Sequence, residues 1–249
     1  MRVRGAVLIL LFFLGAARDA SAADAPCTEH SFEDTRFTVC AYDPRRAELR
    51  LAWTGRDGQA LQTFDRLSAD LGKTARHVRF AMNAGMFEVG GMPLGLYVES
   101  GVERRPVNER NGGGNFYLKP NGVFSQTPYG TLRIDTTEGF LVRSDRPLWA
   151  TQSGPMLVID GAFNRQITAD GPSRNIRNGV GLRSTHSAFF VISDEPVSFG
   201  KLARFFRDGL ACPNALYFDG TVSSLWLPSE ARKDNAAPLG PMVVVLDKH

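Results

Sequence analysis

The sequence carries no large excess of charge of either sign. Its 249 residues hold 29 lysines and arginines against 26 aspartates and glutamates, a net charge of +3. Without the apolar N-terminal segment 1–22, the chain loses three arginines and one aspartate, and the net charge falls to +1. Proteins that bind nucleic acid by electrostatic attraction carry a strongly basic face. The near-neutral balance therefore argues against a nucleic-acid partner.

The short motifs that identify many catalytic and metal sites are also missing. The chain has no G-x-S-x-G, H-E-x-x-H or C-x-x-C sequence. Its glycine-rich segment 111–115 lacks the Gly-Lys-Ser/Thr ending of a phosphate-binding P-loop. The histidines are few, so a histidine-dependent triad or a multi-histidine metal site is poorly supported. They are His30, His77, His186 and His249.

The N-terminus has the composition of a secretory signal peptide. A short basic start is followed by an apolar segment too short to span a bilayer and by the cleavage triplet Ala20-Ser21-Ala22. A retained membrane anchor is the competing interpretation, but the charged pair Arg18-Asp19 directly follows the apolar segment. We therefore predict that residues 1–22 are removed, that no membrane span remains, and that the mature protein is periplasmic or secreted.

Only three cysteines are present, which leaves one unpaired in an oxidising compartment. Cys27 and Cys40 lie close together in the chain and are the predicted disulfide. Cys212 stands beside Pro213 and before an apolar run, and we expect it to be a buried free thiol. A nucleophilic Cys212 is the alternative, although no activating base is near it in the sequence.

Short apolar runs indicate a protein built mostly of β-strands. Residues 37–42 and 49–53 alternate between apolar and polar side chains and are expected to form a hairpin around Asp43-Pro44. Further strands are predicted at 77–83, 94–99, 115–124, 131–134, 155–160, 180–184, 188–193, 215–219 and 241–246.

Two helices interrupt the strands. Residues 59–71 carry apolar side chains at helical spacing, and a second helix is expected to start after the N-cap Ser198 and to stop before Cys212-Pro213. A doubly wound parallel sheet needs more alternation of strand and helix than this. We therefore predict an α+β fold in which residues 23–249 form a single domain of mixed, mainly antiparallel β-sheet.

Several predicted strands end in an acidic residue. Asp160 and Asp219 follow apolar runs and are each followed by glycine, while Glu99 precedes Ser100-Gly101 and Asp194 ends its run without a glycine. Asp-Gly is a common turn dipeptide, so each can be explained as a turn. The alternative is that these strand ends converge on one acidic cleft.

The remaining polar residues suit the chemistry of sugars and phosphates. Carboxylates act as nucleophile or base in the cleavage of glycosidic bonds. Arginine side chains and the backbone amides of glycines bind phosphate. Taken together, these residue types favour a substrate in which a sugar is joined through phosphate.

Ordered motifs along the chain resemble the phosphodiester glycosidase domain family, over about residues 35–246. The similarity implies hydrolysis of the bond between C1 and oxygen of a sugar 1-phosphodiester. The family's usual D-G-G-x-S motif is altered, because Thr221 stands where the second glycine is expected, so the substrate of a family member is not transferred. The motifs are residues 80–87, 93–96, 114–116, 120–124, 152–157, 177–181, 216–220 and 223–224.

Asp219 is the predicted nucleophile or base. Ser223 and Ser224 are expected to hydrogen-bond this carboxylate and hold it, and Gly220 to allow close approach of the substrate. The departing phosphate monoester has a second pKa of about 6, so it needs little protonation at neutral pH. A strong general acid is then less necessary than a group that holds the anion.

Arg183 is the predicted clamp on the phosphate, helped by the amides around Gly179 and Gly181. A surface or ion-paired arginine is the alternative. Asn83 is the predicted sugar or phosphate ligand, unless its amide only satisfies the backbone of a turn.

Ser153 and Gly154 are expected to line the same pocket. Among the other strand-end acids, Asp194 ranks first as a second catalytic carboxylate, ahead of Asp160 and Glu99, which could equally be metal ligands or turn formers.

Two other functions remain open at this stage. A non-catalytic carbohydrate- or envelope-binding protein would keep the fold and the polar surfaces but not need Asp219. A divalent-cation site built from strand-end acids is compatible with either function, because hard cations take carboxylate and carbonyl oxygens. The predicted partner is a small-molecule or glycan sugar phosphate.

Overall fold

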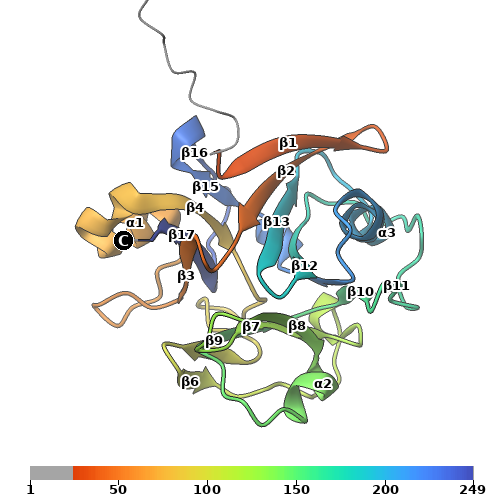
Figure 1. The fold of residues 1–249 in the computed structure, drawn as a ribbon, viewed down its shortest axis with the longest axis horizontal. Helices are drawn as coiled ribbons and strands as arrows, with labels where there is room; N and C mark the ends of the chain where they lie inside the picture. Colours follow the sequence, from red (N-terminus) through yellow and green to blue (C-terminus); the bar gives the residue numbers. More distant parts are fainter. Residues whose placement is uncertain (1–24, 249) are drawn as a thin grey trace, which may run out of the picture.

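The computed structural model describes residues 25–248, which form three β-sheets and three short α-helices (Figure 1). Every pair of neighbouring strands in the sheets is antiparallel. The prediction of an α+β fold with mainly antiparallel sheets is confirmed. The predicted signal peptide lies outside the described residues.

The largest sheet has seven strands and carries most of the candidate site. Its strand order is β1-β2-β13-β12-β14-β10-β11, so sequence neighbours and distant segments alternate across it. The strands are β1 (Cys27–Phe32), β2 (Thr35–Tyr42), β13 (Ser187–Ser193), β12 (Asn178–Ser184), β14 (Asn214–Tyr217), β10 (Met156–Ile159) and β11 (Ala162–Phe163).

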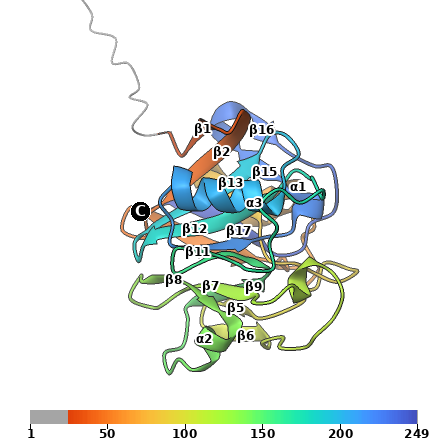
Figure 2. The same cartoon turned by 90° about the vertical axis from the view of Figure 1, so that its right-hand side faces the viewer.

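Two five-stranded sheets complete the architecture. One of them, called the third sheet below, forms the lower part of the molecule together with α2 (Thr137–Leu141) in two perpendicular views (Figures 1 and 2). The second sheet has the order β16 (Arg232–Lys233), β15 (Leu225–Leu227), β4 (Val78–Asn83), β17 (Met242–Asp247) and β3 (Ala47–Ala52). The third has the order β6 (Val102–Arg105), β5 (Tyr97–Glu99), β9 (Trp149–Ser153), β7 (Gly122–Gln126) and β8 (Leu132–Thr136).

One hydrophobic core joins the three sheets. Phe190 of β13 packs against Phe80 of β4 and Phe124 of β7, with ring centroids 5.5 and 5.7 Å apart. All three rings are fully buried. Each buried aromatic side chain of this size removes on the order of 150–250 Å² of surface from water. The sheets are therefore held together by shared apolar burial.

The outer face of the seven-stranded sheet is covered by α3 (Phe199–Arg204) and the π-helical turn that continues it (Phe205–Gly209). Ser198 caps the helix as predicted, because its hydroxyl accepts a hydrogen bond from the Lys201 amide at 3.1 Å. Phe205 stacks on Phe37 of β2 with ring centroids 4.1 Å apart. The helix predicted to begin after Ser198 therefore packs its apolar side chains on the sheet.

The hairpin predicted for residues 37–53 is wrong. β2 pairs with β1 and β13, whereas β3 pairs with β17 in another sheet. The hairpin of this region is instead β1–β2, whose turn at Glu33-Asp34 has φ values of 46° and 59°. Alternation of side chains identifies a strand but not its neighbour, since either arrangement buries the same face.

The helix predicted at 59–71 is shorter in the structure. Helix α1 spans Phe64–Leu71 and begins after the N-cap Thr63, whose hydroxyl accepts from the Arg66 amide. Leu61 is buried from the preceding loop, where Gln62 has a φ of 59°. Leu61 therefore reaches the core from a turn, although its spacing in the sequence indicated a helix.

The cysteines are arranged as predicted. Cys27 and Cys40 are directly opposite each other in β1 and β2 and form a disulfide. Cys212 is a buried free thiol, and burial raises its pKa to about 12. Within residues 25–248, no helix has the length and apolar character needed to cross a membrane.

Candidate active site

Two buried asparagines join the seven-stranded sheet to the second sheet. Asn83 ends β4 and Asn178 begins β12, and both are almost fully buried. The Asn178 side-chain amide donates to the Asn83 side-chain oxygen at 2.9 Å and to its backbone oxygen at 3.0 Å. The Asn83 amide in turn donates to the backbone oxygen of Asp219 at 2.8 Å. This asparagine pair fixes the position of the residue that carries the predicted catalytic carboxylate.

The structure thus places Asn83 behind the Asp219 backbone. Its side-chain oxygen also accepts from the Ser224 amide at 2.9 Å. Its polar atoms are therefore engaged by protein groups, as in the alternative that the residue satisfies the backbone of a turn.

Asp219 lies in a turn directly after β14. It is the N-cap of a short 3₁₀ turn (Gly220–Val222), and its Oδ1 accepts from the Thr221 amide at 3.1 Å. Its own amide donates to Ala84 at 3.3 Å, which ties the turn to the end of β4. The turn predicted from Asp-Gly is present, and it presents the carboxylate at the end of a buried strand.

Burial raises the pKa of Asp219, and the hydrogen bonds from Thr221 lower it in part. Desolvation disfavours the ionised form of a carboxyl group. A carboxyl whose pKa is raised toward the working pH is suited to accept and release a proton. This makes Asp219 the strongest candidate for a chemical role in the site.

Gly220 is required by the hydroxyl of Tyr217. A side-chain carbon at Gly220 would lie 1.8 Å from the Tyr217 oxygen, a distance that no packing adjustment of a few tenths of an ångström can relieve. Tyr217 is itself almost fully buried. The glycine after Asp219 therefore allows the turn to fold closely over the tyrosine.

Arg177 is a buried hydrogen-bond donor to the Tyr217 hydroxyl. Its guanidinium is completely buried and donates to the Tyr217 hydroxyl at 3.0 Å and to Val197 O at 2.8 Å, with Ser173 as a further partner. The guanidinium also lies 3.7 Å from the ring centroid of Phe199. All of these partners are uncharged, so among residues 25–248 no carboxylate forms an ion pair with this guanidinium. Burial raises the pKa of Tyr217, and the charge of Arg177 lowers it in part.

Ser223 and Ser224 do not hold the Asp219 carboxylate, which corrects the sequence-based expectation. The Ser223 hydroxyl lies within hydrogen-bond distance of Ile176 O, Asn178 Oδ1 and Gly220 O, at 3.0, 3.2 and 3.3 Å. The Ser224 hydroxyl donates to Val222 O at 2.8 Å. The serines instead hydrogen-bond the asparagine pair and the turn.

The segment at Ser153 and Gly154 lies beside this turn. Pro155 O accepts from the Tyr217 amide at 3.1 Å. A side chain at Gly154 would collide with Asn121 and Phe116 O, at 2.7 and 2.8 Å. The buried hydroxyl of Ser153 has no hydrogen-bond partner among the described residues. This segment therefore lies beside the Asp219 strand, and its predicted place in the lining of a pocket stays a prediction.

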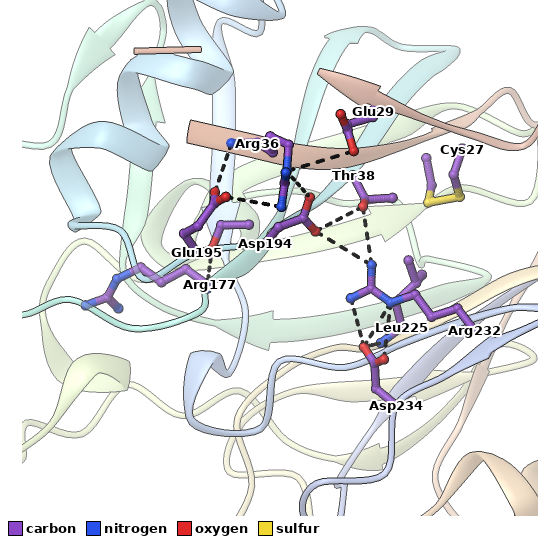
Figure 3. A network of polar contacts seen from close by, with 12 residues as sticks. Cys27, Glu29, Arg36, Thr38, Arg177, Asp194, Glu195, Leu225, Arg232 and Asp234 are labelled. Carbon is purple, nitrogen blue, oxygen red and sulfur yellow. Dashed lines mark hydrogen bonds and ion pairs between the residues drawn. A yellow bond between two sulfur atoms is a disulfide. The ribbon is translucent and has the colours of Figure 1, made fainter. Parts of the chain in front are cut away.

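An open groove of about 550 Å³ begins at Ser223. Ile176 and Asp194 line it from the seven-stranded sheet, and Arg232 and Asp234 line it from the region of β16. Figure 3 shows Asp194 and Asp234 on either side of the Arg232 guanidinium. Because β13 runs antiparallel to β12, Asp194 lies at the same end of the sheet as Asn178 and Asp219.

Arg183 is not at this end of the sheet. It is the sixth residue of β12, and its exposed side chain donates to Leu210 O at 3.1 Å and lies 4.5 Å from the Phe189 ring centroid. It lies five positions along the strand from Asn178, a distance of about 16 Å. The expected grouping of Arg183 with Asp219 and Asn83 is therefore wrong.

The amides of Gly179 and Gly181 are not open to a ligand either. Both residues are paired with β13 and β14 in the middle of the sheet. A side chain at Gly181 would lie 2.5 Å from Phe206 and 2.9 Å from the Cys212 sulfur. Gly181 thus serves the packing of the helical cover on the sheet.

The strand-end acids do not converge on one cleft. Asp160 follows β10, which is antiparallel to β14, so it lies at the opposite end from Asp219 and contacts Asn214. Glu99 belongs to the third sheet, where burial raises its pKa. Within residues 25–248, no three histidine, cysteine, aspartate or glutamate side chains group as metal ligands.

Sequence patterns gave no role to Arg177, Asn178 and Tyr217. All three lie inside the motif blocks 177–181 and 216–220. A signal was present in Arg177, a charged residue placed directly before an apolar strand, but charged side chains are rarely fully buried. The contacts that reveal its place come from residues far away in the chain.

Comparison with known proteins supports one family. The family model described as phosphodiester glycosidase matches residues 76–246. The protein YigE of Escherichia coli (strain K12), described as uncharacterized, is 31% identical over 246 residues, which cover 98% of this chain and 92% of YigE.

Solved structures share the fold at low identity. The catalytic domain of zebrafish N-acetylglucosamine-1-phosphodiester alpha-N-acetylglucosaminidase, auto-inhibited by its pro-peptide, has a TM-score of 0.59 at 14% identity, covering 90% of this chain and 82% of that one. A hypothetical protein from Synechocystis has a TM-score of 0.53 at 13% identity, covering 89% and 61%. A Burkholderia pseudomallei protein described as exported has a TM-score of 0.51 at 12% identity, covering 85% and 74%.

Proposed function

The chain belongs to the phosphodiester glycosidase family, and we propose that it hydrolyses the glycosidic bond of a sugar 1-phosphodiester. The family match covers residues 76–246, which contain the asparagine pair, the Asp219 turn and Arg177. The zebrafish neighbour is named for a bond of this class. A hydrolase acting on a sugar joined through phosphate is therefore the function that the site supports best.

The observation that carries the proposal is the Asp219 carboxylate, presented by a turn that buried residues fix on several sides. Its pKa is raised by burial, and its backbone is tied to Asn83 and Ala84. We assign it as the nucleophile on C1 of the sugar or as the base that activates water. A nucleophile gives retention of configuration at C1 in two displacements, and a base gives inversion in one.

The leaving group of this reaction is a phosphate monoester. Its second pKa is about 6, so at neutral pH it departs without a strong general acid. Breaking the C1–O bond transfers the bonding electron pair to the phosphate oxygen, while water supplies the hydroxyl at C1. The chain therefore needs groups that tolerate developing negative charge more than it needs a proton donor.

Arg177 is our candidate for this positive charge, in place of Arg183. Its N–H groups are directed to protein partners, so it acts across the Tyr217 hydroxyl and not by contact with substrate. No carboxylate of the described part of the chain forms an ion pair with it, and Coulomb interactions in a buried setting are weakly screened. Ser153, Gly154 and Gly220 are buried around the Asp219 turn, and we propose that they shape the site without contacting the substrate.

We further propose that the protein works outside the cytoplasm. The Cys27–Cys40 disulfide and the exported Burkholderia relative agree with the cleavage triplet at residues 20–22. A disulfide of this kind persists in oxidising compartments.

The direct test is the Asp219→Asn variant on N-acetylglucosamine 1-(4-nitrophenyl phosphate). Cleavage of its C1–O bond releases 4-nitrophenyl phosphate, which an added phosphatase converts to coloured 4-nitrophenol, so the coupled assay makes the substrate chromogenic. Asparagine keeps the shape and the Thr221 contact but cannot act as base or nucleophile. We expect kcat/KM to fall by about 10²- to 10⁴-fold. The matched control is Asp160→Asn, another strand-end Asp-Gly at the opposite end of the sheet, with activity close to the parent.

Activity of Asp219→Asn equal to that of the parent would remove the carboxylate from the mechanism. A parent protein that cleaves no sugar 1-phosphodiester but binds glycans would favour the non-catalytic carbohydrate-binding protein. NMR of the freshly released sugar would assign Asp219 as nucleophile or base from the configuration at C1.

A further inference from the structure

The groove that begins at Ser223 contains charges that are already paired with one another. Asp194 lies 3.7 Å from the Arg232 guanidinium and 3.9 Å from that of Arg36. Asp234 accepts from the other side of Arg232 at 3.0 Å. The Thr38 hydroxyl lies between Asp194 and Arg232, 3.3 Å from each (Figure 3). The groove wall therefore carries many hydrogen-bonding groups and little uncompensated charge.

The pairing excludes strongly charged ligands from this wall. An anion would be repelled by Asp194 and Asp234, which flank the only arginine lining the described groove. A metal cation would have to displace the Arg232 guanidinium from between the same two carboxylates. Lys233 is bound to Asp65 at 2.9 Å. The wall thus suits a neutral ligand rich in hydroxyl groups.

Carboxylates and guanidinium groups offer such a ligand favourable partners. A carboxylate oxygen accepts more than one hydrogen bond, so Asp194 and Asp234 keep acceptor sites beside their contacts with Arg232. Hydrogen bonds from hydroxyl groups to ionised partners are stronger than those between neutral groups. The side chains of Asp194 and Asp234 are 21% and 29% exposed, respectively, so a ligand in the groove can reach them.

The groove has the size and the location for part of a larger substrate. Its volume of about 550 Å³ falls within the ~300–1,000 Å³ of pockets that enclose drug-sized ligands. Ile176, which is partly exposed, supplies apolar surface against which the carbon-bound hydrogens of a sugar ring can pack. Ser223 belongs both to the groove and to the hydrogen bonds around Gly220 and Asn178. The groove thus begins at a residue that hydrogen-bonds the Asp219 turn.

We propose that this groove binds uncharged sugar residues beyond the one that carries the phosphodiester. The inference rests on the proposed function and extends it, because the substrate then is an oligosaccharide 1-phosphodiester and not a single sugar. The sugar at the cleaved bond lies near Asp219, and the following residues lie along Asp194, Arg232 and Asp234.

A glycan array probed with the full mature chain and with Asp219→Asn tests the proposal. We expect both proteins to retain neutral oligosaccharides of two or more residues. The dissociation constant for the best-retained oligosaccharide is then measured by calorimetry for two tryptophan variants. Ala236→Trp places a large side chain on an exposed residue of the groove, and Ala162→Trp is the control on exposed β11 at the far end of the sheet. We expect Ala236→Trp to weaken binding at least tenfold and Ala162→Trp to leave it unchanged.

Two further variants keep the test independent of folding defects. Asn235→Ala truncates an exposed groove residue without added bulk, and Asp194→Asn removes one carboxylate charge while keeping its shape. Both are expected to weaken binding by about threefold to tenfold, with thermal unfolding recorded alongside. Retention of no glycan, retention of charged glycans only, or equal affinity of the Ala236→Trp and Ala162→Trp variants would overturn the proposal.

The proposed function and the proposal for the groove are tested by separate measurements, so either can fail without the other. Loss of sugar 1-phosphodiester cleavage is read from the chromogenic substrate, which has no second sugar. Glycan retention is read with the Asp219→Asn protein, which needs no turnover. Glycan binding that survives without any cleavage would therefore leave the groove in place and remove the hydrolase.

Discussion

The two ends of strand β12 differ in almost every physical respect. At its first residue, Asn178 is buried and its amide is divided between two oxygens of Asn83. At its sixth residue, Arg183 is exposed, bound to one carbonyl and laid over the ring of Phe189. The same strand therefore carries a fully satisfied buried junction at one end and a surface arginine at the other. A position in the motif order says little about position in the site, because an antiparallel strand sends its two ends to opposite sides of the sheet.

The largest loss of stability is expected from a substitution at the buried end of β12, where Asn178 contacts Asn83. Asn83→Ala would remove the acceptor of the Ser224 amide, one of the two acceptors of the Asn178 amide and the side-chain donor to Asp219 O, and each buried unsatisfied group costs about 1–3 kcal/mol. We expect a loss of about 3 kcal/mol in the free energy of unfolding, or about 6–12 °C in Tm. Arg183→Ala is the matched change at the exposed end, with a loss of about 0.5–1 kcal/mol. Equal losses in urea unfolding would refute the contrast between the two ends.

A smaller but more local effect is expected at Gly220. Gly220→Ala places a carbon against the Tyr217 hydroxyl, so the Asp219 turn must move. Overpacking of this kind costs about 1–3 kcal/mol, and activity on the chromogenic substrate should fall with it. Gly113→Ala serves as control, because open space surrounds that position and its φ is not positive. Full activity of Gly220→Ala would show that the turn geometry is not needed.

The Asp219→Asn variant should be slightly more stable than the parent at neutral pH. Burial raises the pKa of Asp219, so the folded state binds its proton more tightly than the unfolded state does. Folding is then penalised as the pH rises from the ordinary value of 3.8 through the raised value, and the penalty stays constant above it. We expect the free energy of unfolding of Asp219→Asn to exceed that of the parent by about 0.5–1 kcal/mol at pH 7, which is typical when a destabilising functional residue is replaced.

Thermal unfolding of both proteins from pH 3 to pH 8 measures this difference. The gap should close below the ordinary pKa, where both states of the parent are protonated, and open as the pH rises. A parent that is more stable than Asp219→Asn at neutral pH would contradict the assignment of Asp219 as a desolvated carboxyl. The same raised pKa predicts that activity appears at a higher pH than an ordinary aspartate would allow, because the ionised form is the reactive one.

The smallest effect is expected for chemical labelling of Cys212, which is buried near the Arg183 end of β12. Burial raises the pKa of its thiol to about 12, and Arg183 lowers it in part. The thiolate is the reactive form, so iodoacetamide at pH 8 should not label the folded protein. Labelling should begin only in denaturant. Rapid labelling of the native protein, followed by mass spectrometry, would instead revive a reactive Cys212.

Local chemistry made part of the fold predictable from sequence. The Ser198 cap, the Asp219-Gly220 turn and the Cys27–Cys40 pair depend on residues a few positions apart or on a count of cysteines. Strand pairing was not predictable in the same way. The chain from β2 to β3 passes between sheets, and neither strand's alternation records which neighbour it will have.

The sequence offered a candidate residue where one strand end suffices and missed residues whose place depends on several segments. Asp219 was proposed from its own strand, whereas Arg177 gains its place only from Tyr217, Val197 and Phe199. A buried arginine with uncharged partners is uncommon, so composition gives no reason to expect it. The assignment of the clamp to Arg183 failed for the same reason, since its contacts with Leu210 and Phe189 arise from the packing of the sheet's outer face.

The disulfide has a consequence for the order in which the protein acquires its covalent structure. Cys27 and Cys40 meet across a hairpin that is complete by Tyr42, so their bond requires nothing from the remainder of the chain. The third cysteine is synthesised much later and is enclosed between Gly181 and the helical cover. A chain that folds from its N-terminus can thus oxidise the correct pair before a competing thiol exists, and it then shields the leftover one from exchange.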